Sequence, residues 1–129
     1  MMSKAALKII SEAMKSLGLN YDFPEWEGTP PDHYFTGEYS EVPTLNEDGQ
    51  SETSFLLNGF AKGKEAWLEL ENAKEKIADF FGKVGGHTVI AENGSAVAVF
   101  YSHSLVVPTG NNILKRIEIN LTIKEWSVK

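Results

Sequence analysis

The chain has 129 residues, of which 42% are hydrophobic and 23% are charged, as is typical of one globular domain with its own core. Its formal net charge of −6 argues against broad binding of nucleic acid or anionic membranes, because both need a basic face. The lack of cysteine excludes disulfides, thiolate catalysis and cysteine-based zinc sites. No apolar run is long enough to span a bilayer and no signal-peptide pattern is present, so we expect a cytoplasmic protein.

The first segment, residues 3–17, has the pattern of an amphipathic helix. Ser3 is a suitable N-cap, and Gly18 suits the left-handed conformation that often ends helices. A helix of this length is marginal alone, so we expect it to dock on the rest of the protein. Its apolar residues recur at helical spacing: Ala6, Leu7, Ile10, Ala13, Met14 and Leu17.

Residues 19–31 are expected to form an irregular connection, because three prolines oppose regular strand pairing there. The aromatic side chains of this loop anchor it to the core more readily than they bind a partner, since an ordered loop needs anchors. These aromatic residues are Tyr21, Phe23 and Trp26.

Two strands are predicted next, at residues 33–42 and 53–61. They are expected to pair antiparallel across an acidic loop at residues 43–52. Neither face of the first strand is cleanly apolar, which indicates an edge strand or a partly exposed one. Asn58-Gly59 inside the second strand suggests a β-bulge.

A second amphipathic helix is predicted at residues 65–81, and we expect it to lie across the sheet and close the core. Trp67 and Leu68 fall outside its apolar stripe and suggest a subunit contact. Its glutamates fit ordinary ion pairing with nearby lysines better than acid–base catalysis. The stripe consists of Ala66, Leu70, Ala73, Ile77, Phe80 and Phe81.

Three further strands complete the pattern. Residues 88–92 and 96–101 are expected to form a hairpin at Asn93-Gly94, and residues 102–107 either extend it or kink away. Residues 113–126 alternate between apolar and polar side chains, so one face of this strand should be buried. Trp126 falls on the polar phase: either a bulge at Glu125 turns it inward, or it is available to a partner.

These elements predict a single α+β domain over residues 1–129. We expect a mostly antiparallel four- to five-stranded sheet with two α-helices packed on one face.

We find no sequence pattern for catalytic, cofactor or metal-binding residues, and we do not expect an enzyme. The three histidines, His33, His87 and His103, lack the spacing of metal ligands. The glycine-rich stretch at residues 82–88 lacks the spacing of a phosphate-binding loop and follows a helix rather than opening one.

The order of elements resembles the small tail-terminator (tail-completion) and head–tail joining proteins of long-tailed bacteriophages and their prophages. An amphipathic helix, a proline- and aromatic-rich loop and an acidic hairpin tip are followed by a helix (AWLELENAKEKIADFF), a hairpin and a last strand (IEINLTIKEW). The resemblance covers nearly the whole chain and rests on order and size rather than on a short motif.

The resemblance implies an assembly protein that is found in virions and, during assembly, in the host bacterial cytoplasm. It would form a homo-oligomeric ring, typically a hexamer, that caps the tail tube and contacts the head connector. It would use no cofactor, membrane or sequence-specific nucleic acid. The hairpin tip at residues 46–50 would reach another ring component. The candidate interface residues are Asn46, Glu47, Asp48, Trp67, Leu68 and Trp126.

Two other functions are open from the residues. An immunity- or antitoxin-like module could use the acidic loop to block a basic partner. A small-ligand binder or enzyme would enclose a deep pocket between helix and sheet, lined by His33, Tyr39 or His103.

Overall fold

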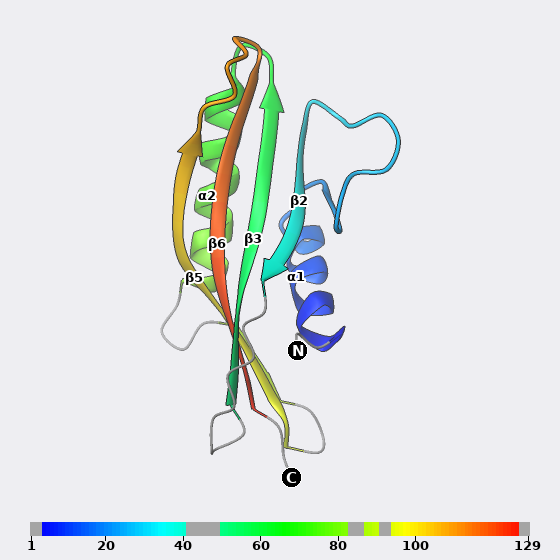
Figure 1. Cartoon of the computed structure of the whole chain (residues 1–129), viewed down its shortest axis with the longest axis vertical. Coiled ribbons are helices and arrows are strands. Elements are labelled where there is room, and N and C mark those ends of the chain that lie inside the picture. The colour runs from blue at the N-terminus through cyan, green and yellow to red at the C-terminus, as the bar shows by residue number, and fades with distance from the viewer. Residues whose placement is uncertain (1–3, 41–49, 83–86, 91–93, 127–129) are drawn as a thin grey trace.

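The computed structural model of the chain describes residues 4–40, 50–82, 87–90 and 94–126. Their order along the chain is helix, three strands, helix, three strands (Figure 1). The elements are α1 (Lys4–Ser16), β1 (Tyr21–Asp22), β2 (His33–Ser40), β3 (Gln50–Lys62), α2 (Ala66–Phe81), β4 (His87–Ile90), β5 (Ala96–Val107) and β6 (Leu114–Trp126).

The strands form one six-stranded sheet in the order β1-β2-β3-β6-β5-β4. The α+β class is confirmed, whereas the prediction of four to five strands is wrong. The extra strand, β1, lies in the segment expected to be irregular and pairs parallel with β2 through only two residues. It ends before Pro24, so the prolines do not prevent it, and two residues are too few to leave a periodic signal.

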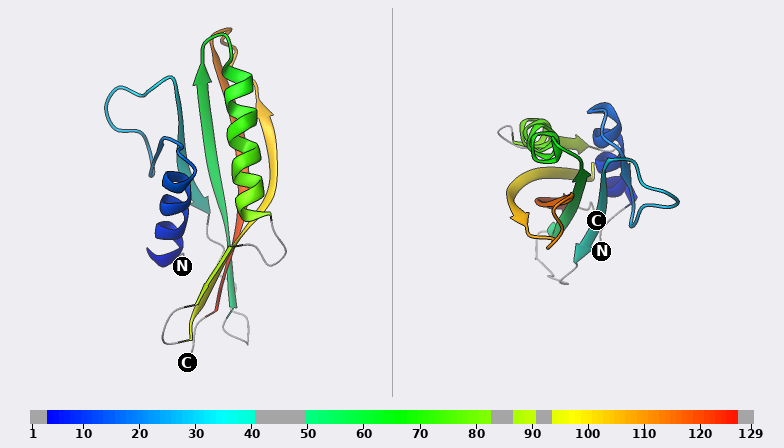
Figure 2. Two further views of the ribbon diagram at one scale, coloured as in Figure 1. Left: turned by 180° about the vertical axis from the view of Figure 1, so that it is seen from behind. Right: turned by 90° about the horizontal axis from the view of Figure 1, so that it is seen from above.

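Both helices pack against the same face of a curled sheet, as the view from behind and the view from above show (Figure 2). The side chains on this face of β3, β5 and β6 alternate with outward-facing ones, as the period of a strand requires. The largest fully buried side chains are Phe55, Phe81, Ile10, Met14, Leu57, Leu70, Ile77, Ile117, Ile119, Leu121, Ile123 and Val99.

Helix α2 begins one residue later than predicted and ends as predicted before Gly82. Its buried residues match the predicted stripe except that Phe80 is half-buried, with its ring edge-on to Phe81 at 4.8 Å. At the end of α1, Gly18 has φ 73°, which confirms its predicted left-handed conformation.

No bulge is present at Gly59. Gly59 of β3 is the cross-strand partner of Phe35 in β2 and of Ile117 in β6, and both strand pairings continue without a register shift. A Cβ atom at Gly59 would lie 2.5 Å from the Phe35 ring and 2.9 Å from Ile117. The glycine therefore makes room for the core side chains of both neighbouring strands.

Strand β3 begins at Gln50, so residues 50–52 belong to this strand and not to the loop predicted at residues 43–52. Residues 46–48, with the candidate contacts Asn46, Glu47 and Asp48, lie outside the described residues.

Strand β5 extends through residues 102–107, with one irregularity between Tyr101 and His103. Strand β6 has no bulge at Glu125 in its described register. Glu125 is buried and Trp126 is half-buried, so the predicted bulge does not turn Trp126 into the core.

Candidate interaction surfaces

The face of the sheet opposite the helices carries a polar cluster at its centre; we call this face the open face. Nδ2 of Asn58 donates a 3.3 Å hydrogen bond to Glu38, and Arg116 donates a 2.7 Å hydrogen bond to Oδ1 of Asn58. Arg116 also pairs with Glu118 at 3.1 Å. The Asn58 side chain is buried although no helix covers it, because the long side chains around it close over it.

Aromatic rings continue this open face toward the loop after β1. The guanidinium of Arg116 lies 5.6 Å from the centre of the Phe60 ring, which stacks on Tyr34, which in turn contacts Trp26. Phe23 stacks against Tyr39 and Phe55 on the opposite side of the sheet. The prediction that the loop aromatics anchor the loop is therefore confirmed.

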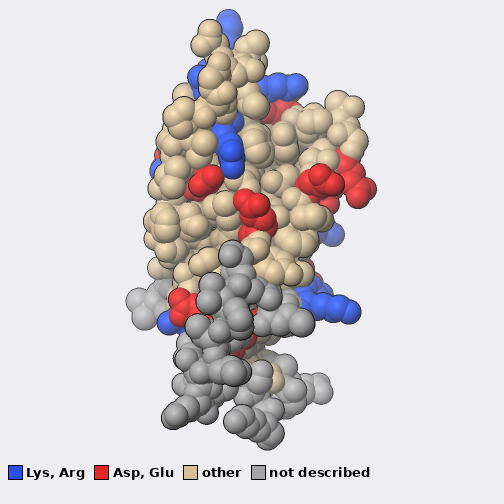
Figure 3. Space-filling model, in the orientation of Figure 1, with Lys and Arg blue, Asp and Glu red and all other residues tan. Residues whose placement is uncertain are grey.

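Charged side chains are few over the strands of the open face, and acidic ones gather over the loop beside β2 (Figure 3). The acidic residues of that loop and its flanks are Asp22, Glu25, Glu27 and Asp32. Acidic side chains at this margin would repel a polyanion.

One edge of the sheet is only partly covered by a neighbouring strand. β4 pairs with β5 only from Ala96 to Val99, and no described strand pairs with the outer edge of residues 100–107. The 12 residues of β5, AVAVFYSHSLVV, include no charged residue and no proline. Leu105 is 46% exposed and Val106 50% exposed, one on each face of this strand. Proteins usually protect such an edge with charge, proline or a covering segment.

The sequence pattern alone does not predict this exposed edge. The uncharged run was a signal that could have done so, but it is also the pattern of a strand buried on both sides. Only the short length of β4 shows that residues 100–107 form an exposed edge and not a strand buried on both sides.

The first turn of α2 places the two predicted contact residues in different directions. Trp67 turns toward the sheet, where Nζ of Lys115 lies 5.9 Å from its ring centre. Leu68 points away from the core and is 56% exposed. At the same end of the molecule Ile113, in the turn between β5 and β6, is 64% exposed. This end therefore presents apolar side chains from the helix and from the turn.

Trp126 lies at the other end of the sheet, opposite Gln50 and Ala96. It lines a groove of about 400 Å³ together with Ile9, Glu12 and Val89. It is therefore far along the strands from Trp67, and the structure does not bring the two predicted tryptophans into one surface.

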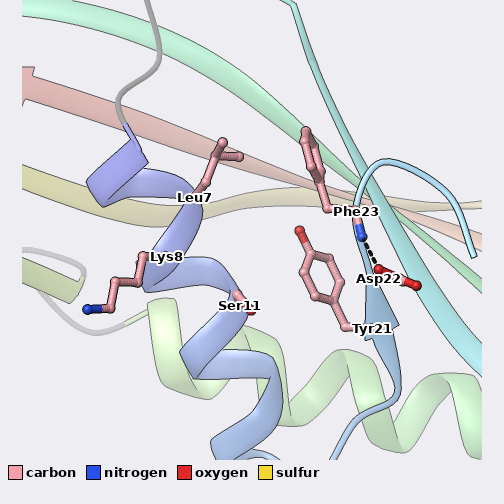
Figure 4. Close-up of a pocket in the computed structure, with 6 residues that line it drawn as sticks. All are labelled: Leu7, Lys8, Ser11, Tyr21, Asp22 and Phe23. Atoms are coloured by element: carbon pink, nitrogen blue, oxygen red, sulfur yellow. Dashed lines mark hydrogen bonds between the residues drawn. The ribbon is translucent and has the colours of Figure 1, made fainter.

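A cavity of about 340 Å³ lies between α1 and β1 (Figure 4). The Tyr21 hydroxyl points toward Leu7 and Phe23, whereas Lys8 extends away from it. Burial raises the pKa of Tyr21, and the nearby charge of Asp22 raises it further. Apolar Leu7 and Phe23 lie near the hydroxyl, and Lys8, Ser11 and Asp22 also line the cavity.

A groove of about 380 Å³ between α2 and β2 includes His33, and its α2 side is formed mostly by exposed polar residues. His87 packs on Phe80, and His103 bonds to Ser102 through Nδ1 at 3.0 Å. Among the described residues, no group of three or more histidine and acidic side chains could hold a metal ion. None of the described helices is long and apolar enough to cross a membrane.

No protein-family model and no curated protein matches this chain. One solved structure superposes with a TM-score of 0.68, over 100% of this chain and 99% of its own, at 18% sequence identity, and its name describes no activity. At this identity the likeness shows a shared fold and nothing of function.

Proposed function

We propose that the protein is a structural subunit of a phage or prophage virion. In this proposal it is a tail-terminator or head–tail joining protein that forms a ring on the end of the tail tube. The single observation that carries the proposal is the uncharged edge of β5. A monomer that kept this edge exposed would risk open-ended aggregation, whereas a closed ring covers it.

The distribution of apolar side chains supports the same proposal. Exposed apolar residues occur at both ends of the strands and on the β5 edge rather than in one pocket. A ring subunit needs contacts of this kind, because it meets two neighbours around the ring and other components above and below. Among the described residues, the large exposed apolar ones are Tyr39, Trp67, Leu68, Val89, Ile90, Leu105, Val106 and Ile113.

Binding to tail-tube subunits tests the proposal directly. The purified protein is mixed with assembled tail tubes of the same phage or prophage and sedimented with them. We expect it to sediment with the tubes and to stop their further elongation. An unrelated acidic protein of similar mass is the control. A protein that neither sediments with the tubes nor changes their elongation contradicts the proposal.

The two alternatives predict different partners. An immunity-like module would capture one basic protein, but the acidic tip on which it rests lies outside the described residues. A small-ligand binder needs a deep pocket, and the groove that includes His33 is formed largely by exposed side chains. No specific observation favours either function over the ring subunit.

A further inference from the structure

We infer that neighbouring subunits join by continuing the sheet, with the β5 edge of one copy added to the β2 edge of the next. This inference rests on the proposed ring and names the joint that closes it. The occupant of the β5 edge is a second copy of this chain, held by main-chain hydrogen bonds and by alternate side chains on both faces.

The β2 edge is available over the part that β1 leaves uncovered. β1 pairs with β2 only at Phe35 and Thr36, and no described strand pairs with the outer edge of residues 37–40. Tyr39 lies in this part and is 41% exposed, although its position in the strand is on the helix side of the sheet. A neighbouring strand would cover it.

The two edges lie at the same level of the sheet. Glu38 is opposite Leu56, Leu56 is opposite Asn120, and Asn120 is opposite His103. If copies are related by rotation about an axis parallel to the strands, Glu38 of one copy thus lies beside His103 of the next. No translation along the axis is needed between the two copies. A contact without a step closes into a ring, whereas a stepped contact gives an open helix.

Strand directions also agree with this joint. β2, β3, β6 and β5 are antiparallel in succession, so β2 and β5 of one chain run in opposite directions. Rotation about an axis along the strands preserves these directions. The β5 edge of one copy therefore meets the β2 edge of the next as an antiparallel pair, which is the arrangement of most pairs in this sheet.

The charges at the two edges are compatible. The joint places the carboxylate of Glu38 opposite the imidazole of His103, and no like charges directly face each other in this row. The competing occupant is the β5 edge of a second copy related by a two-fold axis. That arrangement would bury the uncharged edge but would leave the β2 edge open.

Cross-linking distinguishes the arrangements because the chain has no native cysteine. The double variant Glu38→Cys/His103→Cys places both thiols on the open face in one row. Within a chain the two positions are three strand spacings apart, about 14 Å, which is too far for a disulfide. Under mild oxidation we expect a ladder of covalent oligomers that ends at the mass of the ring. Each single variant should give no ladder.

The outcomes separate the joint from the proposed function. A wild-type ring without a ladder in the double variant overturns the joint and leaves the ring standing. A covalent dimer from His103→Cys alone also overturns it and shows the two-fold arrangement. A protein that stays monomeric and does not bind tail tubes overturns both proposals.

A second variant keeps the test independent of cysteine chemistry. His103→Glu places a carboxylate opposite Glu38 of the next copy, and we expect it to raise the concentration at which the ring half-dissociates by about tenfold or more. Asn112→Glu adds the same charge at an exposed position of the turn before β6 and serves as the control. Equal effects of the two variants contradict the joint.

Discussion

Arg116 donates a 2.7 Å hydrogen bond to Asn58 on a face of the sheet that neither helix covers. Asn58 is 7% exposed, and its amide also donates to Glu38. The sheet therefore holds a hydrogen-bonded polar centre on this face, within which Nε of Arg116 is buried without a hydrogen-bond partner among the described residues. Such a centre positions the side chains around it, including Phe60 beneath the guanidinium.

Removal of the Asn58 amide should cost stability. Asn58→Ala leaves Arg116 with only Glu118 among its described hydrogen-bond partners, and we expect the free energy of unfolding to fall by about 1–3 kcal/mol. Urea denaturation measures the change. Asn112→Ala, in the exposed turn before β6, is the control and should stay within about 0.5 kcal/mol. Similar losses in the two variants would contradict a structural role for the amide.

A methyl group at Gly59 should overpack the core. Because its Cβ would lie 2.5 Å from the Phe35 ring, we expect Gly59→Ala to lower the free energy of unfolding by about 1–3 kcal/mol. In the double variant with Phe35→Leu, part of the clash is relieved, so its loss should be smaller than the sum of the single losses. Strictly additive losses would show that the two residues do not compete for the same space.

Tyr21 should make the fold sensitive to alkaline pH. Burial raises its pKa above the ordinary value of 10.0, so the folded protein holds the phenol proton more tightly than the unfolded chain does. Below pH 10.0, Tyr21 therefore does not make the free energy of unfolding depend on pH. Above pH 10.0, its ionisation in the unfolded chain makes the free energy of unfolding decrease as the pH rises. Tyr21→Phe should show a smaller drop in thermal midpoint between about pH 8 and about pH 11. Equal drops in wild type and variant would contradict this assignment.

Leu68 should contribute to assembly rather than to folding. Its side chain points away from the core, so Leu68→Lys should change the free energy of unfolding by less than about 0.5 kcal/mol. If the ring uses the first turn of α2, the same variant should raise the concentration at which the ring half-dissociates, as measured by light scattering. Asn72→Lys adds the same charge at an exposed position of the same helix. Equal effects of both lysines would exclude a specific contact at Leu68.

The amphipathic patterns predicted both helices and β6 closely, because burial of one face imposes a period on the sequence. β3 begins three residues before its predicted start, and the extension of β5 through residues 102–107 was left open. Three features were beyond this reasoning. β1 is too short to have a period, Gly59 has a packing role that depends on strands distant in sequence, and the free edge of β5 depends on where its neighbour stops. Of the six candidate contacts, Leu68 is the most exposed one that the structure describes, and Asn46, Glu47 and Asp48 are outside it.

The mass of the wild-type protein in solution, alone and with tail-tube subunits, tests the central claim most directly. Native mass spectrometry over a wide concentration range gives the number of copies in each species. The ring proposal predicts a single closed oligomer of more than two copies, either alone or once tail-tube subunits are present. A protein that remains monomeric at the highest concentration, with no complex in the mixture, would contradict it.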